Sequence, residues 1–303
     1  MAILFSTEIM DAIKKELANA TYSVQVITAY CKESSLRYLN SCIGNGVSDK
    51  RLLLRFRMDD VIMGSTDFSV LDYAISEGWK VYIRFDLHAK TYVIDNKRGL
   101  VGSANATHSG LNIGKVGNME MATLVDIEPQ DIIKIDQLFH DAIVVDELIL
   151  EKLREQMNQV HDRAQKTSYS WDSSITSLFN PHISTLFSYE LPDKFTLEPG
   201  EYFSFLDVTY DGDRVKLKEI FRWSNAYLWL KEILKENSEC LYFGEIAEKL
   251  HNVLVSDPKP YRRDVKLMLS YLLELIVDLD MEDIIIDRPN YSQRIRLKNL
   301  KDM

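Results

Sequence analysis

The sequence predicts an α/β domain followed by a smaller, mainly helical domain. In the first half of the chain, stretches with apolar residues at every second position alternate with stretches at helical spacing, as is typical of α/β folds. The 303 residues suffice for two domains. Residues 161–181 are rich in Ser, Thr, Asp and Asn and lack periodic apolar positions. We therefore expect a first domain at 1–160, a linker at 161–181 and a second domain at 182–303.

Each element of the first domain is predicted from its apolar spacing. The stretch 22–29 (YSVQVITA) alternates and is rich in β-branched residues, which indicates a buried strand. Four polar residues at 95–98 separate two short apolar stretches and predict a hairpin. By these criteria, strands are expected at 22–29, 50–58, 80–85, 90–94, 99–102 and 118–126, and helices at 9–17, 32–43, 68–77 and 132–160, the last interrupted near 143–146.

The second domain shows a different order of elements. The Asp-Gly-Asp turn at 211–213 predicts a hairpin of strands at 201–210 and 214–220. Helical spacing follows at 225–236, 243–253 and 261–277, and residues 284–297 predict two short strands. Three helices followed by a hairpin are the order of a winged helix-turn-helix, so we predict a winged-helix-like domain.

Composition is that of an ordinary globular protein, with 46% hydrophobic and 27% charged residues. No apolar run approaches the roughly 20 residues that span a bilayer. The first residues lack the basic start of a signal peptide. Three cysteines without Cys-x-x-Cys spacing favour reduced thiols over a disulfide or zinc site. We expect a cytoplasmic protein with no membrane partner.

Charge restricts how the chain can bind nucleic acid. The formal net charge is −10, and the acidic excess is shared equally by the two halves. Most nucleic-acid-binding domains are basic, so the net charge counts against electrostatic binding of DNA over a broad surface. Any contact with nucleic acid must rest on a local basic patch.

The segment 87–105 (LHAKTYVIDNKRGLVGSAN) carries the chemistry. Residues two apart on a strand share a face, so His88 and Lys90 project together. Ser103 and Asn105 have the same relation after the next strand. If the two strands pair as a hairpin, an imidazole, an ammonium, a hydroxyl and a carboxamide meet at one rim. This set fits a phosphate, because it provides a nucleophile, a cation and neutral donors.

The same residues match a known signature. His88-x-Lys90, Asp95 after four residues, and Gly102-Ser103-x-Asn105 after six more resemble the HxK(x)4D(x)6GSxN motif of the phospholipase D superfamily, position for position. The resemblance implies a phospholipase D-like α/β sandwich for the first domain. It also implies phosphodiester chemistry through a covalent phosphohistidine.

The resemblance assigns a role to each residue. His88 would attack phosphorus, while Lys90, Ser103 and Asn105 would hold the non-bridging oxygens. Glu120, in the Asn-Met-Glu sequence that opens the next expected strand, would hydrogen-bond His88 and fix its tautomer. Two motif residues would be structural, namely Asp95 and Gly102. No metal or other cofactor is expected, because histidine and lysine supply what a divalent ion would.

The chain holds one copy of the motif. The mechanism needs two histidines on opposite sides of one phosphate. None of the other histidines has lysine two residues later: these are His108, His140, His161, His182 and His251. A twofold-symmetric homodimer that brings two copies of His88 together is the simplest solution. Single-motif members of the superfamily assemble in this way, and they are often nucleases.

The second domain offers a local basic cluster. Arg262, Arg263 and Lys266 begin its last expected helix, and Arg294 and Arg296 lie in the final hairpin. These side chains could bind phosphates while the helix enters a major groove. Acidic residues are also frequent in this region. A domain for dimerisation or protein binding therefore stays open as an alternative.

Three functions follow from these observations. The first is a metal-independent DNA endonuclease of a restriction or phage-defence type, with possible protein partners of a defence system. The second is a phospholipid-type phosphodiesterase, and the third is a scaffold that binds nucleic acid without cleaving it. Arg55 and Arg57, on one face of the 50–58 strand, could reach a polyanion near the site or serve only as edge residues.

Overall fold

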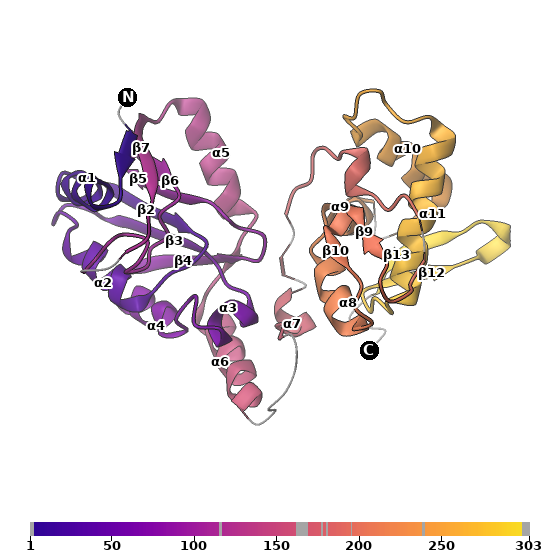
Figure 1. The fold of residues 1–303 in the computed structure, drawn as a ribbon, viewed down its shortest axis with the longest axis horizontal. Coiled ribbons are helices and arrows are strands. Elements are labelled where there is room, and N and C mark those ends of the chain that lie inside the picture. Colours follow the sequence, from indigo (N-terminus) through magenta and orange to yellow (C-terminus); the bar gives the residue numbers. More distant parts are fainter. Residues whose placement is uncertain are drawn as a thin grey trace. The chain divides into compact units, whose positions relative to one another are not determined.

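The computed structural model describes residues 3–114, 117–161, 169–176, 178–179, 181–194, 196–237 and 240–298. The chain forms two compact units, Met1–Phe179 and Asn180–Met303 (Figure 1). This boundary falls near the end of the stretch predicted as a linker. In the part of the chain that the structure describes, no helix has the length and apolarity needed to cross a bilayer.

The first unit is built on one eight-stranded mixed sheet with the order β1-β7-β6-β5-β2-β3-β4-β8. Strands β2, β3 and β4 are parallel, and the other pairs are antiparallel. The strands are β1 (Ile3–Phe5), β2 (Ser23–Thr28), β3 (Asp49–Arg55), β4 (Trp79–Arg84), β5 (Lys90–Ile94), β6 (Arg98–Gly102), β7 (Met121–Asp126) and β8 (Ile143–Val144).

Helices cover both faces of this sheet, as in an α/β sandwich (Figure 1). The central strand β2 is buried at every residue, so it needs apolar cover on both sides. Phe139 of α5 packs against Ile27 and Leu53 on one face, and α1, α2 and α4 lie on the other. The helices are α1 (Thr7–Ala18), α2 (Glu33–Ser41), α3 (Met58–Ile62), α4 (Ser69–Ser76), α5 (Pro129–His140), α6 (Glu147–His161) and α7 (Ser173–Thr176).

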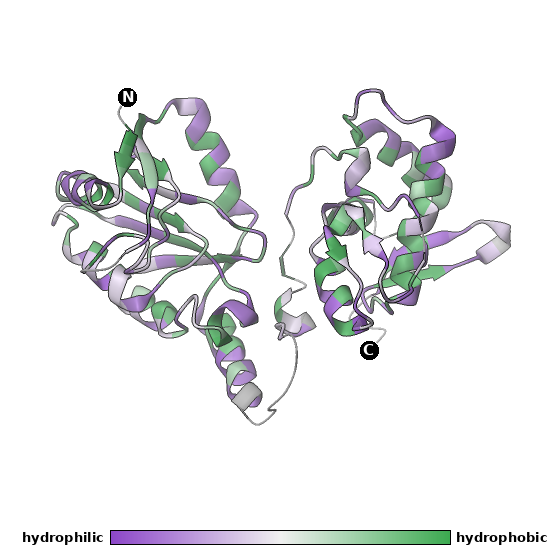
Figure 2. Cartoon of the chain, viewed as in Figure 1, coloured by the Kyte–Doolittle hydropathy of each residue, from purple (hydrophilic) through white to green (hydrophobic). Residues whose placement is uncertain are grey.

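The apolar side chains follow the pattern that the sequence predicts. Figure 2 shows the hydrophobic strands at the centre of this unit and mixed colouring along α5 and α6. Every strand and helix expected in the first domain is present, and the α/β fold class is confirmed. The interruption expected near 143–146 is β8, which pairs with β4 and separates α5 from α6. Strand β1 and helix α3 were not predicted, since each is too short for a periodic pattern.

The stretch predicted as a linker differs in its second half. Trp171 is buried, its indole stacks on Phe56 at 5.7 Å, and its Nε1 donates to the Phe56 carbonyl at 2.6 Å. Phe179 packs edge-on against Phe85 at 5.4 Å. Residues 169–179 therefore belong to the first unit, because their aromatic side chains supply apolar area that their Ser-rich neighbours lack. Residues 162–168 lie outside the described part of the chain.

The second unit has the winged-helix-like order that the sequence predicts. Three helices, α9 (Asn225–Glu236), α10 (Phe243–Val253) and α11 (Arg262–Asp278), pack around one apolar core. A three-stranded sheet of order β11-β13-β12 combines β11 (Cys240–Tyr242), β12 (Ile284–Asp287) and β13 (Arg294–Leu297). The final pair, β12 and β13, forms the wing hairpin.

One predicted hairpin in this unit is wrong. Residues 214–220 were expected as a strand, but they form helix α8 (Arg214–Arg222). The Asp213 carboxylate accepts hydrogen bonds from Val215 N at 3.0 Å and Lys216 N at 3.1 Å, so the Asp-Gly-Asp sequence starts a helix. The remaining short elements are β9 (Tyr202–Phe203), β10 (Val208–Thr209) and the 3-10 turns Ser188–Glu190, Ser204–Leu206 and Pro289–Tyr291.

Candidate active site

The motif residues meet at one rim of the sheet. Strands β5 and β6 pair antiparallel with Thr91 opposite Val101, so the start of β5 adjoins the end of β6. Lys90 is the first residue of β5, and Ser103 and Asn105 follow β6 directly. We call this edge the rim. The hairpin expected from the sequence thus brings the two halves of the motif together.

His88 lies in the loop that connects β4 to β5, and its side chain is exposed. Desolvation lowers the pKa of the imidazole, and the positive charges of Lys90, Arg55 and Arg57 lower it further. A lower pKa favours the neutral imidazole near neutral pH. This is the form that can act as a nucleophile.

Lys90 is half-buried beside His88. Its Nζ donates to the His88 carbonyl oxygen at 2.6 Å. Desolvation and the charge of Arg55 lower the pKa of the ammonium, while the carboxylate of Glu120 opposes them. Glu120 therefore helps to keep Lys90 charged within a cationic neighbourhood.

Glu120 contacts Ser103 and not His88. Its buried carboxylate accepts from the Ser103 hydroxyl and, at 3.1 Å, from the Asn118 side-chain amide. The expected hydrogen bond to His88 is not formed between these two described residues. The cause is the register, because Gly102 pairs with Ala122 and places the residue before β7 beside the end of β6.

The Ser103 hydroxyl is therefore engaged within the protein. It also accepts from the Met121 amide at 3.1 Å, while the Ser103 amide donates to the Met121 carbonyl at 2.9 Å. These bonds fix the end of β6 against β7. Ser103 thus holds Glu120 in place, whereas the resemblance assigns its hydroxyl to a phosphate oxygen.

Asn105 is oriented by its side-chain oxygen. Oδ1 accepts from the Tyr30 amide at 3.1 Å and from the Thr28 hydroxyl at 3.3 Å. These bonds leave the side-chain NH2 group without a partner among the described residues. The amide can therefore donate to an incoming anion, as the resemblance implies.

Asp95 lies in the hairpin turn at the opposite end of these strands. Its carboxylate accepts from the amides of Thr21, Tyr22 and Ser23 at 2.7–2.9 Å, and from the Thr21 hydroxyl at 2.9 Å. Desolvation raises the pKa of this carboxyl, but the hydrogen bonds outweigh it and the pKa is lowered. Asp95 ties the hairpin to the start of β2 and is remote from the rim.

Gly102 is required by the approach of two strands. A Cβ at this position would lie 2.4 Å from the Met121 carbonyl oxygen and 2.5 Å from the Ala122 Cβ. Real Cβ atoms essentially never come so close. The motif glycine therefore lets β7 pack tightly on β6 and brings Glu120 to Ser103.

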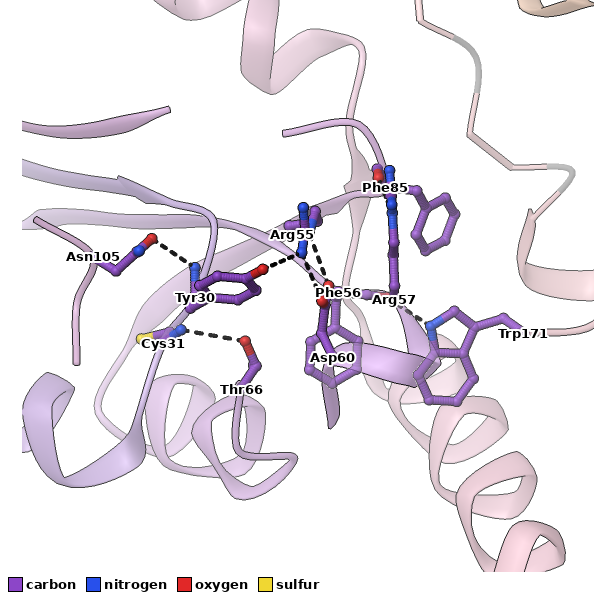
Figure 3. Close-up of polar contacts among 10 residues, drawn as sticks. All are labelled: Tyr30, Cys31, Arg55, Phe56, Arg57, Asp60, Thr66, Phe85, Asn105 and Trp171. Carbon is purple, nitrogen blue, oxygen red and sulfur yellow. Dashed lines mark hydrogen bonds and ion pairs between the residues drawn. The ribbon is translucent and has the colours of Figure 1, made fainter. Parts of the chain in front are cut away.

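Two arginines beside the rim were left undecided by the sequence (Figure 3). Arg55 donates to both oxygens of Asp60 at 2.7 and 2.8 Å and to the Tyr30 hydroxyl at 2.7 Å. Tyr30 also binds Asn105 through its backbone amide, so it links the motif to Arg55. Arg57 donates from Nε to the Phe85 carbonyl at 2.5 Å. Tyr30 and Asp60 were not predicted, because neither lies in a motif.

The basic residues of the second unit fall into two groups. Arg262, Arg263 and Lys266 are exposed in the first turns of α11. Arg294 forms a two-point ion pair with Asp287 at 2.7–2.9 Å, and Arg296 lies 3.9 Å from the same carboxylate. The wing arginines are therefore partly neutralised within the hairpin.

Metal-binding groups were searched for in the described residues. No cluster of three or more His, Cys, Asp or Glu side chains there could hold a metal ion. Cys31, Cys42 and Cys240 are free thiols. Burial strongly raises the pKa of the Cys31 thiol, which keeps it protonated and unreactive.

Comparison with known proteins identifies a domain within the first unit. Residues 13–143 match the family model described as "Cardiolipin synthase, PLD-like domain". Nuc of Salmonella typhimurium, a phospholipase D family member, is 14% identical over 48% of this chain and 99% of its own, with a TM-score of 0.39. NucT of Helicobacter pylori is 14% identical over 48% of this chain and 98% of its own, with a TM-score of 0.37.

A third similar structure is the phosphatidylserine synthase of Haemophilus influenzae Rd KW20. It is 13% identical over 53% of this chain and 46% of its own, with a TM-score of 0.37. No curated protein matches the chain. The matched region 13–143 contains the whole rim, from His88 to Glu120. Residues 13–143 of the first unit thus match a phospholipase D-like domain.

Proposed function

We propose that this protein is a metal-independent DNA endonuclease that acts as a homodimer, with His88 as its nucleophile. The observation that carries the proposal is the rim itself. The exposed imidazole of His88, whose pKa is lowered, lies beside the Lys90 ammonium. The side-chain NH2 group of Asn105 is available to donate a hydrogen bond. This set supplies attack, charge neutralisation and hydrogen bonding to a phosphate without a metal ion.

The chemistry proceeds in two balanced steps. A ring nitrogen of His88 attacks phosphorus, and the bond from phosphorus to the leaving alcohol oxygen breaks. The His88 of a second copy, in its protonated form, gives its proton to that oxygen. This second imidazole then takes a proton from water, the hydroxide attacks phosphorus, and the phosphorus–nitrogen bond breaks.

The other rim residues act on the non-bridging oxygens. Lys90 and the Asn105 amide stabilise the charge that these oxygens carry in the transition state. Glu120, held by Ser103, is a positioning residue that keeps Lys90 protonated. Asp95 and Gly102 maintain the hairpin that presents the motif.

An apolar patch next to the rim supports the dimer. It consists of Ile3, Phe5, Val101 and Met121, with exposed fractions of 62, 47, 43 and 50%. Phe5 pairs with Met121, and Ile3 and Val101 both pair with Thr123, so the four residues share one face of β1, β7 and β6. Ser103 follows Val101 by two residues, which continues that face to the rim. A second copy docked here would bring its own His88 close to the first.

DNA is the substrate that the second unit favours. A winged-helix-like fold with Arg262, Arg263 and Lys266 exposed at the start of α11 suits backbone contacts to a duplex. A catalytic unit joined to a DNA-binding unit suits a restriction or phage-defence role with protein partners. The alternative is a phospholipid phosphodiester, which the description of the matching family model favours.

The decisive assay is cleavage in EDTA. Wild-type protein is incubated with plasmid DNA and, separately, with phospholipid vesicles. We expect EDTA-resistant DNA cleavage that His88→Ala abolishes and that His140→Ala, an exposed histidine of α5, leaves intact. Hydrolysis of the vesicles alone would select the phospholipid function. DNA binding without any cleavage would refute the nuclease proposal and support a scaffold that binds DNA.

A further inference from the structure

Arg57 differs from the other arginines of the first unit. Six arginines described there form salt bridges with carboxylates: Arg37, Arg51, Arg55, Arg84, Arg98 and Arg154. Arg57 forms no ion pair with any residue that the structure describes. Its guanidinium is nevertheless half-buried. Desolvation and the charge of Arg55 lower its pKa, and the charges of Asp60 and Asp86 only partly oppose them. A partly buried cation without a counter-ion is costly to the fold, which suggests that an anion binds it.

Hydrogen bonds hold both the side chain of Arg57 and the residue before it (Figure 3). Its Nε donates to the Phe85 carbonyl at 2.5 Å. The preceding residue, Phe56, donates its amide to the Arg84 carbonyl at 3.0 Å and accepts from Trp171 at 2.6 Å. The two terminal nitrogens of Arg57 have no acceptor among the described residues. One nitrogen of the guanidinium thus fixes the position of the side chain, and the other two nitrogens are free to donate to a ligand.

Arg57 lies close to the nucleophile. Phe85, which anchors it, is three residues before His88, and the charge of Arg57 acts on the His88 imidazole. The charge of the neighbouring Arg55 is neutralised by Asp60. Arg57 therefore contributes a positive charge that no ion pair among the described residues neutralises, although the carboxylates of Asp60 and Asp86 act on it without contact.

Arg57 lies on the side of the site away from Asn105, the residue that would hold the attacked phosphate. Asn105, at the rim, binds the backbone of Tyr30, and the hydroxyl at the far end of Tyr30 binds Arg55. The length of a tyrosine side chain thus separates Asn105 from Arg55. Strand β3 ends at Arg55, before the predicted end at residue 58, and Arg57 lies beyond it, directly before α3. Arg57 is therefore suited to an anion next to the scissile group.

We propose that Arg57 binds the phosphate adjacent to the scissile phosphodiester in a nucleic-acid strand. This inference rests on the proposed function and defines the substrate class more narrowly. A guanidinium can hold a phosphate through two parallel hydrogen bonds, and Arg57 has two nitrogens for this purpose. A second phosphate at fixed spacing occurs in every nucleic-acid strand. It also occurs in a lipid with two phosphates, such as cardiolipin, but the winged-helix-like unit favours nucleic acid.

The experiment compares two substrates in the full-length chain. Bis(p-nitrophenyl) phosphate has a single phosphorus, whereas a DNA oligonucleotide has many. We expect Arg57→Gln to lower kcat/KM at least about tenfold more on the oligonucleotide than on the small ester, because the charge-assisted contact to the second phosphate is lost. The logarithm of the oligonucleotide binding constant falls with the logarithm of the salt concentration. The steepness of this slope should decrease by the amount that about one phosphate contact contributes. Arg57→Lys, which keeps the charge, should recover part of the loss.

Arg98→Gln is the matched control. It removes one guanidinium from the opposite end of β6, where Arg98 pairs with Asp126, and should leave the ratio of the two activities unchanged. Equal losses of Arg57→Gln on both substrates would refute the adjacent-phosphate site while the nuclease function stands. A selective loss on cardiolipin vesicles and not on DNA would refute the nucleic-acid assignment. Wild-type protein inactive on every substrate would instead overturn the proposed function.

Discussion

At the scale of single residues, the site depends on how charges are arranged around His88. Lys90, Arg55 and Arg57 all lower the pKa of its imidazole after desolvation, and no carboxylate is hydrogen-bonded to it among the described residues. The motif predicted that His88 and Lys90 lie together at the rim, as they do, and the role of His88 as the nucleophile stays a prediction. The partner of Glu120 could not be predicted, because it depends on the register between β6 and β7. Asp60 and Tyr30 carry no motif and appear only in three dimensions.

The first prediction concerns the pH dependence of cleavage. The pKa of His88 lies below its ordinary value of 6.5, so the attacking imidazole is neutral above that pH. Activity should therefore rise with pH along an acid limb that lies below 6.5, and fall at higher pH as the His88 of the second copy loses the proton that it gives to the leaving oxygen. Arg57→Gln removes one of the charges that lower this pKa, so its acid limb should move to higher pH. A pH–rate profile measured at constant ionic strength checks both statements, and an unchanged limb would contradict them.

The second prediction concerns Asp95. In the wild type, three backbone amides donate to the Asp95 carboxylate. Asparagine would place an NH2 group, itself a donor, against these amides. We expect Asp95→Asn to lower the free energy of unfolding by about 1–3 kcal/mol at pH 7. Because the folded pKa is lowered from 3.8, this contribution is present above 3.8 and is lost as pH falls through the folded value.

Urea unfolding of the two proteins between pH 7 and pH 3 measures this effect. Asp11→Asn, an exposed change on α1 of the same unit, is the control and should be neutral. A destabilisation that does not diminish toward low pH would show that the charge of Asp95 is not the cause.

At the scale of elements, periodic apolar patterns predicted the sheet strands and the winged-helix-like order. The errors have physical reasons. An Asp-Gly-Asp sequence suits a hairpin turn as well as a helix N-cap, and only the packing of Leu217 and Phe221 in the core decides for α8. Residues 169–179 lack periodicity, yet Trp171 and Phe179 attach them to the first unit. Single aromatic anchors of this kind leave no periodic signal.

The third prediction tests the contact between β6 and β7. Gly102→Ala places a methyl group into the Met121 carbonyl and the Ala122 side chain, and the strands must separate. We expect a loss of about 1–3 kcal/mol of stability. Cleavage should also fall, because Ser103 and Glu120 move apart. Gly64→Ala, at a loop position with open space but positive φ, is the comparison for a glycine change without such a contact. Full activity of Gly102→Ala would contradict the proposed role.

At the scale of the whole molecule, the single motif and the exposed apolar patch point to the same assembly. The dimer stays a prediction, as does the role of the second unit. Arg294 and Arg296 lie against Asp287, so DNA contacts from this unit should depend more on the start of α11 than on the wing. The basic residues could be identified from the sequence. Their ion pairs could not, because these depend on the register of β12 and β13.

The fourth prediction tests this assembly. Phe5→Asp puts a charge into the apolar patch and should convert the dimer to a monomer, measured by sedimentation velocity. The monomer lacks the second imidazole, so cleavage should fall by a factor on the order of 100 or more. Ile133→Asp is the control, since Ile133 is an exposed apolar residue of α5 outside the patch. A fully active Phe5→Asp monomer would contradict the two-histidine mechanism.

The central claim is that His88 becomes covalently bound to phosphorus. Wild-type protein is mixed with an excess of DNA oligonucleotide in EDTA, quenched in alkaline detergent during the first turnover, and digested for mass spectrometry. We predict a nucleotide adduct on the peptide that contains His88, stable in base and released by acid. Cleavage at full rate with no adduct on His88, or with the adduct on another residue, would contradict the account.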